Sequence, residues 1–228
     1  MSSATFTHTL LRSQTHSASG LRFLPIFHLL SGDPMGQACS IARPFEETVR
    51  FGPITGAQSS GDSVEWLTQQ LSKVASATHG QTDHHRPILL PTPASCFEDA
   101  NTASACDNTV ARTSLCQQEI CLEFSDSALV GSAKSAAQRV QLLRSHGFRV
   151  AVDMRTSWQS QIDDSMRLLI DTIRIDAEML EESPELVEKV EYAAAGGVII
   201  VAENAHWRDG EYLSEMGVSC AISPRTDA

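Results

Sequence analysis

FRVAVDM (148–154) is a short apolar stretch with a carboxylate near its end, and two later stretches repeat the pattern, DTIRIDA (171–177) and GVIIVAE (197–203). Each is short and rich in β-branched residues, as is typical of a buried β-strand. A helical segment between the last two begins at the capping residue Ser183 and stops at Gly196. Strands that alternate with helices in this way predict a parallel sheet covered by helices.

The same alternation extends along most of the chain. Further strands are expected at residues 21–30, which a Ser-Gly-Asp-Pro turn closes, and at 38–42, 87–91, 119–125 and 217–222. Further helices are expected at 62–75, 132–147, 159–170 and 207–217, and the polar segment 95–109 is expected to be a connection. About seven or eight such strands favour a closed (β/α)8 barrel of the TIM type within the α/β class. No Gly-x-Gly-x-x-Gly or P-loop motif supports an open, doubly wound sheet.

Composition narrows the class of protein. The net charge of −11 is unfavourable for binding nucleic acid, since an acidic surface repels phosphates. The six cysteines have neither zinc-site nor disulfide-framework spacing. No stretch reaches the roughly 20 apolar residues of a membrane span, so we expect a cytoplasmic protein without membrane contact. Residues 1–20 lack periodicity and predict a flexible N-terminal arm, followed by one domain at 21–228.

Carboxylates stand at four consecutive predicted strand ends: Glu123, Asp153, Asp176 and Glu203. In a barrel of this type the carboxyl ends of the strands meet on one face, where catalytic groups lie. Oxygen ligands that converge in this way suit Mg²⁺ or Mn²⁺. A second interpretation stays open, in which each carboxylate caps the following helix or pairs with a nearby arginine. If the carboxylates bind no cation, Arg174 or Arg155 is expected to neutralise them.

A series of segments resembles the EAL family of cyclic di-GMP phosphodiesterases, in the family's order. The segments are RFLPIFHLLSG, CLEFSDS, LLRSHGFRVAVDM, DTIRIDAEML, VIIVAEN and EMGVS, and they extend from about Leu21 to Ile222. The resemblance implies a modified (β/α)8 barrel whose active members use two divalent cations and a metal-activated water to cleave cyclic di-GMP. By position, Glu123, Asp153 and Glu203 correspond to metal-site carboxylates, and Asp176 corresponds to the Asp of a Lys-Ile-Asp motif.

Departures from the family pattern fall on its functional positions. Ala38-Cys39-Ser40 stands where the family has its Glu-Ala-Leu triplet. The other departures are Pro91 for a metal-binding Asn, Met154 for a second Asp, Arg174 for a Lys that assists the attacking water, and His206 for a Glu. Loss of a single ligand commonly lowers metal affinity or activity 10- to 100-fold. We therefore expect a degenerate EAL-like domain with no catalytic residues, no cofactor, and weak binding of Mg²⁺ or Mn²⁺ at most.

Three residues are candidates for nucleotide or phosphate contact. Arg43 lies one position from the place of a phosphate-binding Arg, which aligns with Ala42. Arg174 can hold a phosphate bidentately, or it can pair with the retained carboxylates. Trp158 follows a strand end, where it can stack a base or pack into the rim. Trp66, in contrast, is interpreted as the sheet-facing anchor of its helix.

The sequence leads to three hypotheses about function. The first is a non-catalytic regulatory protein of bacterial signalling or motility control that acts through a protein partner. The second is a receptor that binds cyclic di-GMP without hydrolysing it. The third is a phosphodiesterase that uses the residual carboxylates with one cation. The partner, the pathway and the oligomeric state are left open by the sequence.

Overall fold

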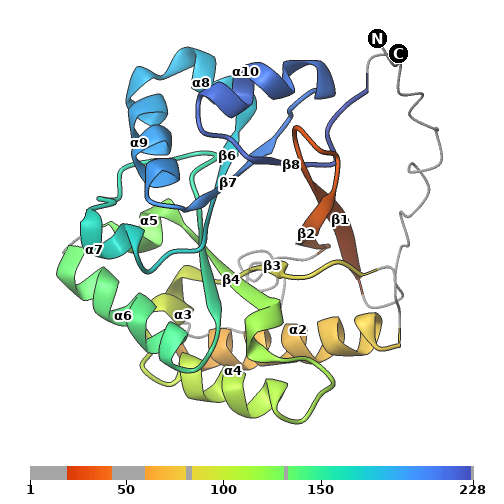
Figure 1. Cartoon of the computed structure of the whole chain (residues 1–228). Helices are drawn as coiled ribbons and strands as arrows, with labels where there is room; N and C mark the ends of the chain where they lie inside the picture. The colour runs from red at the N-terminus through yellow and green to blue at the C-terminus, as the bar shows by residue number, and fades with distance from the viewer. Residues whose placement is uncertain (1–19, 43–59, 81–83, 131–132, 227–228) are drawn as a thin grey trace.

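The computed structural model describes residues 20–42, 60–80, 84–130 and 133–226 (Figure 1). Within these ranges, eight strands form a closed barrel in chain order. They are β1 (Leu21–His28), β2 (Pro34–Ile41), β3 (Ile88–Pro91), β4 (Ile120–Ser125), β5 (Arg149–Asp153), β6 (Thr172–Asp176), β7 (Ile199–Glu203) and β8 (Cys220–Ile222). The predicted closed barrel is therefore confirmed.

The first strand runs against the others. β1 pairs antiparallel with both β2 and β8, and every other neighbouring pair is parallel. The cause is the short connection after His28, because a tight turn can join only antiparallel strands. His28 N donates to Asp33 O at 2.9 Å and Gly32 N donates to His28 O at 2.9 Å. Gly32 has a φ of +73°, a conformation that favours glycine.

Alternate residues of the strands fill the barrel interior. One interior layer is apolar and consists of Ile26, Ala38, Leu89, Cys121, Ala151, Val201, Cys220 and Ile222. Their neighbours along the strands, such as Val150, Val152 and Ile173, belong instead to the larger core under the helices. This alternation follows from the period of two residues in a β-strand. The barrel is closed by packed side chains and is not a pore.

Helices cover the outside of the barrel, as Figure 1 shows. They are α2 (Ser60–Thr78), α3 (Ala94–Glu98), α4 (Thr102–Val110), α5 (Asp126–Leu129), α6 (Ala133–Ser145), α7 (Asp164–Arg167), α8 (Ala177–Glu182), α9 (Pro184–Ala195) and α10 (Gly210–Glu215), with the 3-10 turns η1 (Gln117–Glu119) and η2 (Trp207–Asp209). Ser183 caps α9, since its hydroxyl accepts from Leu186 N at 3.2 Å. None of the helices in the described ranges has the length and apolarity that crossing a membrane requires.

Two expectations about helices were wrong. The segment 95–109 is not an irregular connection but forms α3 and α4, because Phe97, Cys106 and neighbouring apolar residues are buried on one side despite many polar residues between them. The helix expected at 159–170 is reduced to the four residues of α7. Residues 157–160 before it are bound by the Asp126 carboxylate instead, through the hydroxyls of Ser157 and Ser160 and through backbone amides.

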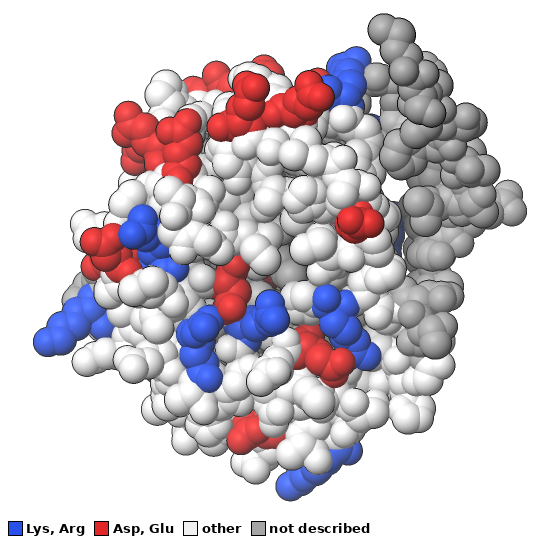
Figure 2. Space-filling model, viewed as in Figure 1, with Lys and Arg blue, Asp and Glu red and all other residues white. Residues whose placement is uncertain are grey.

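Charge is distributed unevenly over the surface. Acidic side chains gather over α8, α9 and α10 at the top of the view in Figure 2. These helices carry Glu178, Glu181, Glu182, Glu185, Glu188, Glu191, Glu211 and Glu215. A face of this charge is unfavourable for a phosphate backbone. The predicted arm at residues 1–20 and the candidate Arg43 lie, apart from Gly20, outside the described residues.

Candidate functional site

The carboxyl ends of the parallel strands surround a cavity of about 380 Å³, which we call the barrel mouth. One wall is apolar and includes Leu24, Ile41, Trp66, Pro91 and Pro93. The other side carries the charged residues Glu123, Asp153, Arg155, Arg174 and Glu203. A cavity of this size lies in the range of small-ligand sites in proteins. It also lies where functional groups of such barrels gather.

The five charged residues form one continuous ion-pair network. Arg174 Nη1 donates to Glu123 Oε1 and Oε2 at 3.2 and 3.0 Å, and Arg174 Nη2 donates to Glu203 Oε1. Arg155 Nη1 donates to Glu203 Oε2 at 2.7 Å. Arg155 Nε and Nη2 donate to Asp153 Oδ1 and Oδ2 at 2.9 and 2.7 Å. The expectation that Arg174 or Arg155 neutralises the carboxylates is confirmed, and both arginines take part.

Strand geometry explains why these side chains meet. Ile173 and Ile175 are fully buried in the core under the helices, so Arg174 between them faces the barrel interior. Glu123 likewise lies between Leu122 and Phe124, which belong to the outer core. Both charged side chains are almost fully buried, at 7% and 3% side-chain exposure. An ion pair this buried needs many hydrogen bonds to offset the loss of hydration.

Burial raises the pKa values of the three carboxyl groups, and ion pairing lowers them. The pKa of Glu123 is raised, because burial disfavours its charge more than the Arg174 guanidinium favours it. At Asp153 burial also opposes ionisation, but the hydrogen bonds and charge of Arg155 hold the pKa below its ordinary value. The pKa of Glu203 is lowered in the same way, against burial, by Arg174 and Arg155. Two of the three carboxylates are thus stabilised as anions by guanidinium groups.

Cys39 also lines the barrel mouth but is not an activated nucleophile. Burial raises the pKa of its thiol to about 12, with a smaller contribution from the Glu123 charge. The thiolate is the reactive form of cysteine, so a thiol of this pKa is inert near neutral pH.

Asp176 lies outside the network, although the sequence placed it with the other three carboxylates. Its Oδ1 accepts from Glu178 N at 3.1 Å and so caps α8. Its Oδ2 accepts from Asn204 Nδ2 at 2.9 Å, and Asn204 Oδ1 accepts from Arg225 Nη2 at 3.0 Å. The helix-cap interpretation therefore describes Asp176, and the expected ring of four carboxylates is reduced to three.

The positions of the departures from the family pattern offer no further anionic ligand. Ala38 is buried in the apolar interior layer, and Pro91 lines the barrel mouth. The Met154 side chain is fully buried in the outer core, and its backbone N donates to Arg174 O at 2.7 Å. His206 is half-buried beside η2, and its backbone forms an isolated parallel β-bridge with Arg225.

Of the two alternatives for Trp158, packing applies, and Trp66 has a second role in addition to the predicted one. Trp158 does not line the barrel mouth, and its half-buried ring packs against the core. Trp66 also packs against the core, as expected, but in addition it lines the barrel mouth. Its position early in α2 was the available signal, because the first turns of a helix that follows a barrel strand lie near the rim.

The residues of the barrel mouth do not fit a divalent cation. Hard cations need carboxylate oxygens with free lone pairs that converge on one point. In the part of the chain that the structure describes, no three Asp, Glu, His or Cys side chains are arranged to hold a metal ion. The two guanidinium groups lie between the carboxylates instead. No reaction step through a metal is therefore derived for this site.

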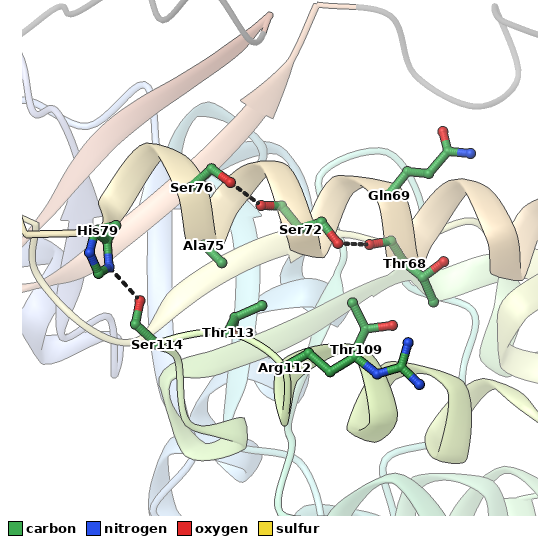
Figure 3. A pocket seen from close by; sticks show the side chains of 10 residues that line it. All are labelled: Thr68, Gln69, Ser72, Ala75, Ser76, His79, Thr109, Arg112, Thr113 and Ser114. Carbon is green, nitrogen blue, oxygen red and sulfur yellow. Dashed lines mark hydrogen bonds between the residues drawn. The ribbon is translucent and has the colours of Figure 1, made fainter.

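A second groove, of about 480 Å³, lies between α2 and α4 on the outside of the barrel (Figure 3). Hydroxyl groups line it, but Ser76 and Ser72 donate to carbonyl groups of their own helix. His79 Nδ1 is 3.1 Å from Ser114 Oγ. Of the described residues that line it, Arg112 and His79 are ionisable. Within the described part of the chain, the groove brings together no group of catalytic or ligating side chains, so the barrel mouth is the better candidate.

Solved structures with the same fold come from several proteins. The chain resembles "PaMucR Phosphodiesterase, c-di-GMP complex" with a TM-score of 0.66 and 19% identity, covering 89% of each chain. It resembles the EAL domain of Mycobacterium smegmatis DcpA with a TM-score of 0.64 and 17% identity, covering 89% of this chain and 88% of that one. It resembles a manganese and cyclic di-GMP complex of Klebsiella pneumoniae BlrP1 with a TM-score of 0.68 and 14% identity, covering 92% of this chain but only 56% of that one.

Sequence comparison identifies the family. No curated protein matches the chain. The family model of the EAL domain matches residues 55–208, more than half of the chain. This match covers β3 to β7 and therefore the charged residues of the barrel mouth. Together with the closed barrel whose first strand is reversed, it assigns the chain to the EAL domain family.

Proposed function

We propose that this protein acts in cyclic di-GMP signalling as a non-catalytic regulator that works through contact with a protein partner. The observation that carries the proposal is the position of Arg174. Its guanidinium lies between Glu123 and Glu203, and it donates to both. A cation held by these two carboxylates would need the same space and the same oxygen atoms.

Among the described residues that line it, the barrel mouth also offers no free group to activate water. Metal-dependent hydrolysis requires a cation to lower the pKa of its bound water. A general base must reach the proton that it removes, with a pKa near the working pH. Asp153 and Glu203 have lowered pKa values and are engaged by Arg155, and Glu123 is buried against Arg174. These carboxylates serve as counter-ions for arginine rather than as bases.

Three altered positions support the same conclusion. Ala38 offers a methyl group, Pro91 has no side-chain donor or acceptor, and Met154 points into the core. The resemblance to the family implies an oxygen ligand at each of these positions. Each lost ligand lowers the metal affinity by its own factor, and the factors multiply when the ligands act independently.

A receptor that binds cyclic di-GMP without cleaving it is the second candidate. The cavity of about 380 Å³ and the Trp66 indole on its wall favour this alternative, because aromatic walls stack nucleobases. The charge of the cavity opposes it. Three carboxylates and two arginines carry a formal charge of −1, which repels a dianionic dinucleotide. A phosphodiesterase that uses one cation ranks last, because it requires the arginines to leave the carboxylates.

We propose that the protein works in the cytoplasm. All six cysteines are free, five of them buried, as is usual for proteins of a reducing compartment.

The test is a calorimetric titration with cyclic di-GMP, with and without Mg²⁺ or Mn²⁺, followed by chromatography of the nucleotide. The proposal expects neither linear product nor heat of binding. Binding without product would favour the receptor instead. Formation of linear product at a rate above that of a buffer control would overturn the non-catalytic assignment.

A further inference from the structure

The ion-pair network leaves none of its carboxylate oxygens without a guanidinium donor. Both oxygens of Glu123 accept from Arg174, and both oxygens of Asp153 accept from Arg155. Glu203 accepts from Arg174 through Oε1 and from Arg155 through Oε2. A cation that entered the barrel mouth would have to bind oxygens that already accept charge-assisted hydrogen bonds, and it would lie close to two guanidinium charges of the same sign.

The two arginines are also held in place by the protein. Arg174 lies on β6, and its neighbours on the strand are locked in the core. Arg155 is followed by residues 157–160, which are bound from two sides. The buried Asp126 accepts from Ser157 Oγ at 2.8 Å and from Gln159 N at 2.6 Å, and Lys189 Nζ donates to Ser160 O at 2.9 Å. The backbone that carries each arginine is therefore fixed close to the carboxylates.

We propose that Arg155 and Arg174 are built-in counter-ions that exclude divalent cations from the barrel mouth. We further propose that removal of both guanidinium groups creates a cation site from the three carboxylates Glu123, Asp153 and Glu203. This inference concerns the metal selectivity of the site, so it holds or fails independently of whether cyclic di-GMP is bound or cleaved.

The physical argument rests on charge and on geometry. Three carboxylates on β4, β5 and β7 repel one another unless a positive charge lies between them. A guanidinium is a planar, permanent cation whose donors match carboxylate oxygens, so it can take this role in a buried site. Without the arginines, the carboxylates stay on rigid strands around the same cavity, and their side chains are free to turn toward a common point, which they do not share in the present arrangement. A compact cation that prefers oxygen ligands then becomes the best remaining counter-ion.

The experiment uses Mn²⁺ alone as the probe. The wild-type protein and the double variant Arg155→Met/Arg174→Met are titrated with MnCl₂, followed by electron paramagnetic resonance of free Mn²⁺ and by thermal denaturation. The wild type is expected to bind no Mn²⁺ and to keep its melting temperature. The double variant is expected to bind Mn²⁺ and to melt at a higher temperature as MnCl₂ rises, because a ligand of the folded state stabilises it.

Two controls define the site. Adding Glu203→Gln to the double variant removes the carboxylate that both arginines share, and the Mn²⁺ response should be lost. Arg144→Met breaks an ion pair elsewhere, in which Arg144 Nη1 lies 2.5 Å from Asp171 Oδ2, and it should create no Mn²⁺ response. If the double variant does not fold, Arg155→Met alone frees both oxygens of Asp153 and should bind Mn²⁺ more weakly.

Stoichiometric Mn²⁺ binding by the wild type that Glu203→Gln abolishes would overturn the exclusion of cations. A folded double variant that ignores Mn²⁺ would overturn the second half of the proposal. Failure of the proposed function would be seen differently, as linear nucleotide in the chromatogram.

Discussion

Arg174 on β6 donates to both carboxylate oxygens of Glu123 on β4, with β5 between the two strands. The pair spans the barrel mouth in the layer above the apolar interior. It therefore links strands that share no backbone hydrogen bonds. The same guanidinium donates to Glu203 on β7. One side chain of β6 therefore forms hydrogen bonds with residues of β4 and β7 at the face where the candidate site lies.

Removal of this guanidinium should destabilise the fold strongly. Arg174→Met leaves the Glu123 carboxylate buried without a counter-ion, and breaking a buried pair in this way costs about 3–5 kcal/mol. Unfolding in urea, followed by circular dichroism, measures the loss. The double variant Glu123→Leu/Arg174→Met should recover a large part of it, because no buried charge then lacks a partner. A loss below about 1 kcal/mol for the single variant, the range of surface pairs, would contradict this account.

The buried Asp126 should stabilise the segment that follows Arg155. Asp126→Ala removes the acceptor for Ser157 Oγ, Ser160 Oγ and the backbone N of Gln159 and Ser160. Donors left unsatisfied in a buried place cost about 1–3 kcal/mol each. We expect lower stability in urea and faster cleavage by trypsin after Arg155. Glu191→Ala, on the exposed side of α9, is the control and should change neither measurement.

Acid should weaken the network through Asp153. Its pKa is lower in the folded protein than the ordinary value of 3.8, so its contribution to stability is present above that value. The contribution is lost as the pH falls through the folded pKa. Glu123 has a raised pKa and acts with the opposite sign, since its contribution is present below the ordinary value of 4.5 and is lost as the pH rises. Asp153→Asn should therefore lose less stability than the wild type as the pH falls below the ordinary value of 3.8, as urea unfolding at each pH can show. An equal loss in both proteins would exclude Asp153 as the source.

Two glycines with positive φ allow a matched test of packing. Gly217 lies at the turn before β8, and Gly80, after α2, is the control. Gly217 has a φ of +88°, and a Cβ there would lie 2.9 Å from Ala194 Cβ of α9. Gly80 has a φ of +68°, and a Cβ there would meet no atom of the described residues within 4 Å. Both alanine variants should lose about 1–2 kcal/mol from the left-handed backbone conformation. Gly217→Ala should lose more, because of the steric clash, and equal melting temperatures for the two variants would contradict this.

Local sequence patterns predicted a large part of this protein. Strands such as residues 149–153 and 199–203 combine apolar, β-branched residues with flanking turns. Ser183 caps the helix that follows it, because its side chain accepts a hydrogen bond from Leu186 N in the first turn. These features depend on neighbours within a few residues, so they can be recognised without the fold. The placement of Glu123, Asp153 and Glu203 on one face followed from strand order alone. Pairing of Arg174 with carboxylates was one of two alternatives that the sequence left open.

Only the tertiary structure decided which of these residues meet. Asp176 follows the same local pattern as Asp153 and lies opposite Glu203 in the β6–β7 register, yet its carboxylate caps α8 and bonds Asn204. The sequence could not show that both arginines share Glu203, since the three residues lie up to 48 positions apart. It also could not show the burial of Phe97 in α3 and of Cys106 in α4 beneath polar neighbours, which stabilises these two helices. Burial and long-range ion pairing are properties of the packed chain, because they arise only when distant segments exclude water together.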